Sequence, residues 1–114
     1  MTKLITYSYL DEISGGDKDF QREIVGTFLE EMANEMVKFR AAIEAKDWPV
    51  LGGLAHKAKA PIGMMCTDVM KELVLKVEKN AKSESELDEL PGNVSQLLAY
   101  LEEAMAQLRA DLNS

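Results

Sequence analysis

Apolar residues recur at spacings of three and four along residues 17–46, and this pattern constrains the fold of the chain most strongly. Side chains three and four positions apart share one face of an α-helix, so the spacing predicts one long amphipathic helix. A stripe of this length needs burial against other elements, because most helical stability in proteins comes from packing. The stripe comprises Phe20, Ile24, Phe28, Met32, Met36, Phe39 and Ile43.

A short helix precedes this segment and a third helix follows it. Residues 14–17 (Ser-Gly-Gly-Asp) predict a turn that ends in the N-cap candidate Asp17, and a short helix is expected over about residues 6–13. Asp47 is the cap candidate of the third helix. We expect Pro61 to kink or end that helix, because proline lacks an amide hydrogen. The expected inward residues of these two helices are Tyr9, Leu10 and Ile13, then Val50, Leu51, Leu54, Ala58 and Ile62.

Two more amphipathic helices complete the chain. Residues 67–68 (Thr-Asp) cap the fourth helix, residues 82–90 form a polar connection, and the last helix starts near residues 91–93. The pattern predicts an all-α fold, an up-and-down four-helix bundle with a short extra N-terminal helix, as a single domain over residues 1–114. The expected inward residues are Val69, Met70, Leu73, Val74 and Val77, then Val94, Leu97, Leu98, Leu101, Met105, Leu108 and Leu112.

Composition excludes several classes of function. The net charge of −7 disfavours binding to nucleic acid and to anionic lipid. No apolar segment approaches the roughly 20 residues of a membrane span and no signal peptide is evident, so we expect a cytoplasmic location. Cys66 is the only cysteine; a nearby helix N-terminus could lower its pKa, yet a structural role is expected. A di-iron bundle needs Glu-x-x-His pairs on two helices, and one histidine cannot supply them.

His56, the only histidine, is the candidate functional residue. At about 100° per residue, the apolar positions of its helix span an arc of about 140°. By the same arithmetic His56 lies roughly 170° from the centre of that arc, so we expect its ring to face solvent. Residues three and four positions away share its helical face. They are Gly52, Gly53, Lys59 and Ala60, with Gly63 one turn later.

The residues around His56 suggest a reaction at its ring. Two adjacent glycines inside a helix cost about 1 kcal/mol each relative to alanine. They leave room for another protein to approach the imidazole, or alternatively for another helix to pack closely. Lys59 could neutralise a phosphoryl group on the ring, or be an ordinary solvated charge. Lys57 points about 100° away and reaches the ring only through its flexible stem.

Residues 55–60 read Ala-His-Lys-Ala-Lys-Ala, and Gly-Met-Met follows at 63–65. This motif resembles the signature of the histidine-containing phosphotransfer (HPt) domains of bacterial phosphorelays, an Ala-His pair with a lysine three residues after the histidine. The resemblance extends to residues 9–17, to the helix that carries Phe20 and Phe28, and to residues 47–48 (Asp-Trp). The chain departs from the family at Ala58, usually a larger apolar residue, at Ala60 and Pro61, which lack hydroxyls, and at Cys66, often glycine.

The resemblance implies a phosphocarrier without kinase activity of its own. Neutral His56 would accept a phosphoryl group from a receiver-domain aspartate and pass it to another response regulator. The implied partners are receiver domains and a hybrid sensor histidine kinase; we expect a monomer with no metal site or cofactor, the Mg²⁺ being on the receiver. Besides His56 and Lys59, the expected docking surface comprises Gly52, Gly53, Lys57, Ala60, Gly63 and Met64.

Two further features frame this hypothesis. The chain lacks the Gly-x-x-x-x-Gly-Lys loop that cradles nucleotide phosphates, so phosphorylation from ATP is not expected. An alternative also stays open at this point, a binding module that docks on a receiver and inhibits it without carrying phosphate. Replacement of His56 separates the two, because only the carrier needs the ring.

Overall fold

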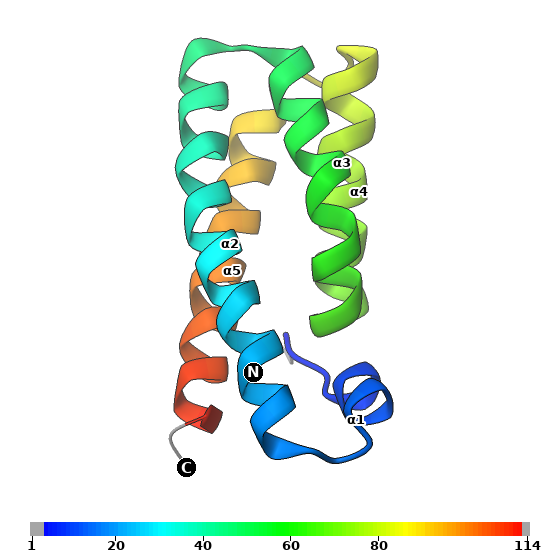
Figure 1. Ribbon diagram of the computed structural model, residues 1–114. Coiled ribbons are helices and arrows are strands. Elements are labelled where there is room, and N and C mark those ends of the chain that lie inside the picture. Colours follow the sequence, from blue (N-terminus) through cyan, green and yellow to red (C-terminus); the bar gives the residue numbers. More distant parts are fainter. Residues whose placement is uncertain (1–3, 113–114) are drawn as a thin grey trace.

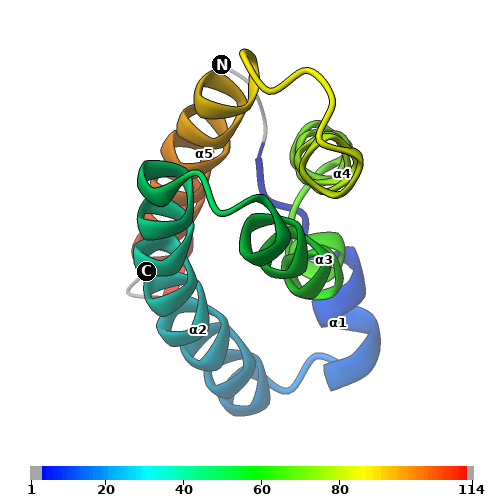
Figure 2. The ribbon, with the colours of Figure 1, turned by 90° about the horizontal axis from the view of Figure 1, so that it is seen from above.

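The computed structural model describes residues 4–112, and within this range the chain forms five helices. The four long helices alternate in direction, and each packs on the next around a ring, with α5 closing on α2 (Figure 1). Viewed from above, α2 and α5 lie on one side and α3 and α4 on the other (Figure 2). The predicted up-and-down bundle is confirmed. The helices are α1 (Ser8–Ser14), α2 (Lys18–Ala45), α3 (Trp48–Met65), α4 (Asp68–Ser83) and α5 (Leu90–Leu112).

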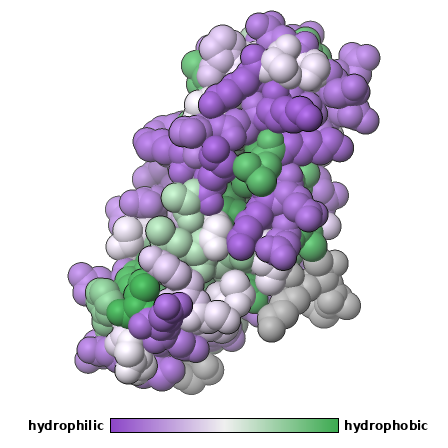
Figure 3. Space-filling view, turned by 90° about the vertical axis from the view of Figure 1, so that its right-hand side faces the viewer, coloured by the Kyte–Doolittle hydropathy of each residue, from purple (hydrophilic) through white to green (hydrophobic). Residues whose placement is uncertain are grey.

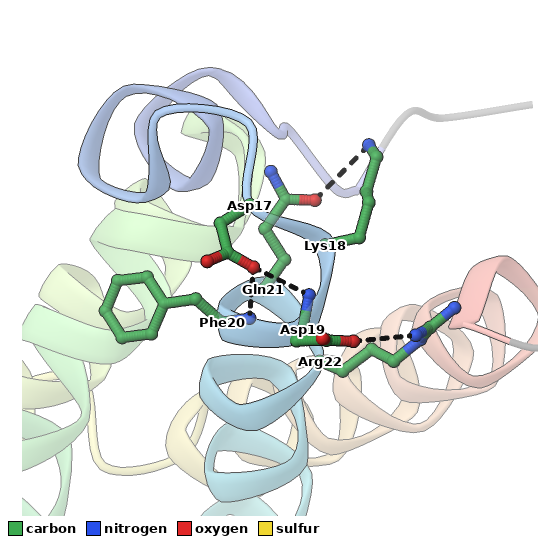
Figure 4. Close-up of polar contacts among 6 residues, drawn as sticks. All are labelled: Asp17, Lys18, Asp19, Phe20, Gln21 and Arg22. Carbon is green, nitrogen blue, oxygen red and sulfur yellow. Dashed lines mark hydrogen bonds and ion pairs between the residues drawn. The ribbon is translucent and has the colours of Figure 1, made fainter.

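Aspartate side chains start the second and third helices, as predicted. The Asp17 carboxylate accepts hydrogen bonds from the backbone amides of Asp19 and Phe20 at 3.0 and 3.2 Å (Figure 4). Asp47 accepts one from the amide of Val50 at 3.3 Å. These bonds satisfy amides that have no partner within their own helix, which fixes where each helix begins.

Pro61 does not end α3, which continues to Met65. Proline removes one hydrogen bond from the helix, but the residues after it are held by packing. Ile62 and Met65 are buried, and the amide of Cys66 donates to the carbonyl of Ile62 at 2.8 Å. The His56 helix therefore extends a full turn beyond the proline, and this turn carries Gly63 and Met64.

The core contains most of the residues that were predicted to face inward, but for five residues this prediction is wrong. Tyr9, Ile13 and Phe20 are 39–42% exposed, because they line a shallow groove where α1, α2 and α3 meet at one end of the bundle. Val50 and Val69 lie in the first turns of their helices, where the neighbouring helices do not cover their side chains. Val25 is buried on α2, although it was not predicted to be. The side chain of Leu112 lies outside the described side chains.

The segment before α1 closes the fold against the turn between α3 and α4. Ile5 and Cys66 form an isolated antiparallel bridge, in which the amide of Thr6 donates to the carbonyl of Met65 at 3.1 Å. The amide of Thr67 in turn donates to the carbonyl of Leu4 at 2.9 Å. Leu4 and Ile5 are both buried in the core cluster by this contact.

The buried side-chain amide of Gln21 links α2 to α1. The Gln21 side chain donates to the Asp11 carboxylate at 3.0 Å and to the Ser14 hydroxyl at 2.9 Å. At the same end of the bundle the Tyr7 hydroxyl donates to the carboxylate of Asp111 on α5. Burial, and then this bond, raise the pKa of Tyr7 above its ordinary value.

The surface carries charged and polar groups over most of its area. Figure 3 shows the side with α1, α3 and α4, where hydrophilic atoms predominate and hydrophobic atoms form small separate patches. Within residues 4–112, no helix combines the length and hydropathy that crossing a bilayer requires.

Candidate functional site

His56 projects from the middle of α3 into solvent, as its position on the helix predicts. Its side chain is 62% exposed, whereas Ala55 and Ala58 beside it are buried in the core. The buried neighbours fix the helix against the bundle, so the ring stands on a rigid element. An exposed ring on a rigid helix is accessible to a reacting partner.

A carboxylate on the neighbouring helix contacts the ring. Glu78 of α4 places its Oε2 atom 2.6 Å from Nδ1 of His56, and the Glu78 side chain is only 11% exposed. Glu78 stands one turn after Val74 and next to Val77, both of which are buried. A charged residue at such an inward position needs partners, because an unpaired buried charge is costly.

Two lysines supply those partners. Lys59, one turn after His56 on α3, places Nζ 2.9 Å from Oε1 of Glu78. Lys82, one turn after Glu78 on α4, places Nζ 3.0 Å from Oε2. The bond from Lys59 lowers the pKa of Glu78 most; burial opposes it, and the bonds from Lys82 and His56 lower it further, to about 2. Glu78 is therefore ionised at neutral pH.

This contact decides which nitrogen of His56 can react. An ionised carboxylate only accepts hydrogen bonds, so Nδ1 must carry the hydrogen that it donates to Glu78. In the neutral ring the lone pair then lies on Nε2, which is the nucleophilic atom. Glu78 is distant from His56 in sequence, and it is the packing of α3 on α4 that brings its carboxylate beside the ring.

Gly52 belongs to the helix interface and not to an exposed docking surface, which corrects its predicted role. It is buried, and a Cβ atom at this position would lie 2.9 Å from Cγ of Lys82 and 3.6 Å from Cβ of Ala81. The alternative interpretation, close packing of another helix, applies here. At Gly53, which is exposed, an added Cβ would meet open space.

The remaining predicted docking residues follow α3 toward its C-terminal end. Ala60 and Met64 are exposed, and Gly63 is half-buried. Lys57 is exposed on the α2 side of α3, in a groove that also contains Glu35 and Lys38, so it takes no part in the Glu78 contacts. Met64 lies where this groove meets the apolar groove of Tyr9, Ile13 and Phe20.

Other reactive chemistry finds little support among the described residues. Cys66 is fully buried, and burial raises the pKa of its thiol to about 12, so the thiol is not activated by a nearby helix N-terminus. Within residues 4–112, no three His, Cys, Asp or Glu side chains gather as a set of metal ligands.

Two comparisons with known proteins give a match. A family model described as the Hpt domain matches residues 23–111. The crystal structure of histidine-containing phosphotransfer protein B (HptB) from Pseudomonas aeruginosa PAO1 superposes with a TM-score of 0.84 at 17% sequence identity. The match covers 96% of this chain and 94% of that one. A search of curated proteins gives no significant match.

Proposed function

Because this chain belongs to the Hpt domain family, we propose that it is a phosphorelay intermediate whose His56 accepts a phosphoryl group from a receiver-domain aspartate and passes it to another response regulator. Histidine phosphotransfer is the role of the family. Our proposal names the donor and the acceptor of the phosphoryl group. The observation that carries it is the exposed ring whose Nδ1–H is held by the buried, ionised Glu78.

The contact with Glu78 favours the transfer step itself. The Nε2 lone pair attacks phosphorus, the Nε2–P bond forms, the P–O bond of the aspartyl phosphate breaks, and the aspartate leaves as a carboxylate. Nδ1 keeps its hydrogen throughout, so the ring gains positive charge as it attacks. Glu78 already lies 2.6 Å from that nitrogen, and it stabilises the developing charge without moving.

The partner supplies the rest of the reaction. Phosphoryl transfer depends on positioning and on cations around the phosphoryl oxygens, and we assign the Mg²⁺ to the receiver. Gly53, Ala60, Gly63 and Met64 lie along the exposed edge of α3 around the ring, and we infer that a receiver rests on them. We further propose that the phosphoryl groups originate from a hybrid sensor histidine kinase, that the protein acts as a monomer, and that the relay operates in the cytoplasm.

Incubation with a phosphorylated receiver and Mg²⁺ tests the proposal. We expect the wild-type protein to gain an acid-labile, base-stable label, and His56→Gln to gain none while it still binds the receiver. Receiver binding is measured separately by calorimetry, and helical content by circular dichroism. A wild-type protein that binds and inhibits the receiver without ever becoming labelled would show an inhibitory module in place of a carrier.

A further inference from the structure

Two lysines contact the same buried carboxylate, and they do so in different ways. Lys59 alone contacts Oε1 of Glu78, at 2.9 Å. Lys82 contacts Oε2, at 3.0 Å, and shares that oxygen with Nδ1 of His56. Lys59 can therefore leave the carboxylate without disturbing the oxygen that holds the ring, whereas Lys82 stabilises that oxygen directly.

The charges explain why two lysines are needed. Glu78 and the two lysines together carry a net charge of +1; a phosphoryl group on Nε2 brings about two negative charges, and the ring that keeps its Nδ1 hydrogen carries one positive charge. The phosphoryl oxygens attract an ammonium group, and Lys59 lies one turn from the ring on the same face of α3. Once Lys59 turns to the phosphoryl group, Lys82 is the lysine that stays at Glu78, and a second anion lies nearby. A like charge nearby weakens the ionised form of a carboxylate.

We propose that Lys82 is a positioning residue for phosphotransfer, which holds the Glu78 carboxylate beside His56 when Lys59 moves from Glu78 to the phosphoryl group of His56. This inference rests on the proposed function, because it assigns a role in the phosphorylated state. Lys82 does not touch the reacting atoms; it acts through Glu78 on the ring. Its effect should therefore depend on whether His56 carries phosphate.

Gly52 leaves room for the Lys82 side chain to reach Glu78. The Lys82 stem passes over Gly52 on its way to Glu78, so close that a Cβ atom there would lie 2.9 Å from Lys82 Cγ. Cγ is near the root of the side chain, so an alanine at this position displaces the whole stem and with it the ammonium group. Gly52 thus allows Lys82 to reach the site, which gives a physical reason for a glycine inside α3.

Chemical phosphorylation provides a test that needs no partner protein. Phosphoramidate transfers its phosphoryl group to the ring, the Nε2–P bond forms and ammonia leaves, and ³¹P NMR follows the product. We expect Lys82→Gln to lower the rate of phosphohistidine formation about two- to fivefold, a modest effect because Lys82 is 53% exposed. Lys82→Arg should restore the rate. Lys76→Gln, which removes the same charge from an exposed position of α4, should leave it unchanged.

The state of the His56 ring shows whether the effect of Lys82→Gln on the rate is more than structural. In ¹⁵N spectra, Lys82→Gln should keep the Nδ1–H signature before phosphorylation, since Lys59 still holds Glu78, and lose it afterwards. A Lys82→Gln variant that matches Lys76→Gln in rate and keeps the signature in both states overturns the proposal. Absence of phosphohistidine in the wild-type protein after phosphoramidate treatment overturns it as well.

A double-mutant cycle tests the contribution of Gly52. Gly52→Ala should slow phosphorylation about as much as Lys82→Gln does, and should have no further effect in a Lys82→Ala background, where the clashing Cγ is gone. An equal effect of Gly52→Ala in both backgrounds contradicts the steric argument. If phosphoramidate labels His56 and these variants behave as expected, but no phosphorylated receiver does, the proposed function fails while the role of Lys82 stands.

Discussion

Replacement of Glu78 by methionine should slow phosphorylation of His56 without weakening the fold. Methionine has a similar length and an apolar, flexible side chain that suits a buried position. The two lysines that lose their partner are 33% and 53% exposed and can turn to water. Replacing a buried ion pair by an apolar residue is often neutral or stabilising, so we expect the free energy of unfolding of Glu78→Met to stay within about 1 kcal/mol of wild type.

The expected size of the effect follows from one hydrogen bond. A bond to a charged group contributes about 1.5–3 kcal/mol. The ring of His56 is 62% exposed, so water competes and the lower value applies. About 1.4 kcal/mol corresponds to a factor of ten, so loss of Glu78 should shift the ratio of the two ring tautomers about tenfold toward Nε2–H. The population with a free Nε2 lone pair, and with it the phosphorylation rate, should fall by at most the same factor.

Two measurements check this prediction. Long-range ¹H–¹⁵N correlation of the ring reports the tautomer, and ³¹P NMR with phosphoramidate reports the rate. Glu78→Gln should be intermediate, because its carbonyl oxygen can still accept from Nδ1–H, and Glu72→Met on the exposed face of α4 should behave as wild type. A folded Glu78→Met variant with wild-type tautomers and a wild-type rate would refute the reasoning.

Three other predictions concern the fold and its buried groups. Phe39 is fully buried, so Phe39→Ala should lower the free energy of unfolding by about 3–5 kcal/mol in urea titrations, and a loss below about 1 kcal/mol would contradict its place in the core. The pKa of Glu78 is about 2 in the folded protein against 4.5 ordinarily; its contribution to stability should be complete above pH 4.5 and disappear as the pH falls toward 2. Urea unfolding at several pH values should show this loss, and Glu78→Gln should reduce it. Cys66, buried and with its pKa raised to about 12, should react with iodoacetamide only when the protein unfolds; rapid labelling of the folded protein at pH 8 would argue against this.

Periodicity alone was sufficient to predict the helices and the exposure of His56. The long stripe of α2 and the caps at Asp17 and Asp47 are local features, which spacing and side-chain chemistry determine. The five residues wrongly predicted to face inward lie in the first or last turns of their helices. Phe20 continues the stripe of α2, but it lies in the first turn, where a helical pattern cannot reveal whether another element covers it.

Glu78 was missed because it is distant from His56 in sequence and lies on another helix. No spacing rule connects the two residues, and only the packing of α3 on α4 brings them together. One sign was available: Val74, Val77 and Ala81 are buried on α4, and Glu78 interrupts that inward face with a charge. A charged residue on the inward side of an amphipathic helix is a reason to look for partners on the neighbouring helix.

The bridge between Ile5 and Cys66 has a consequence for synthesis of the protein. Leu4 and Ile5 are synthesised before the backbone groups that pair with this segment, which belong to residues 65–67. At about 5–20 residues per second, translation needs about 3–12 s to reach them. During that interval two large apolar side chains of the nascent chain lack their final cover and are available to chaperones.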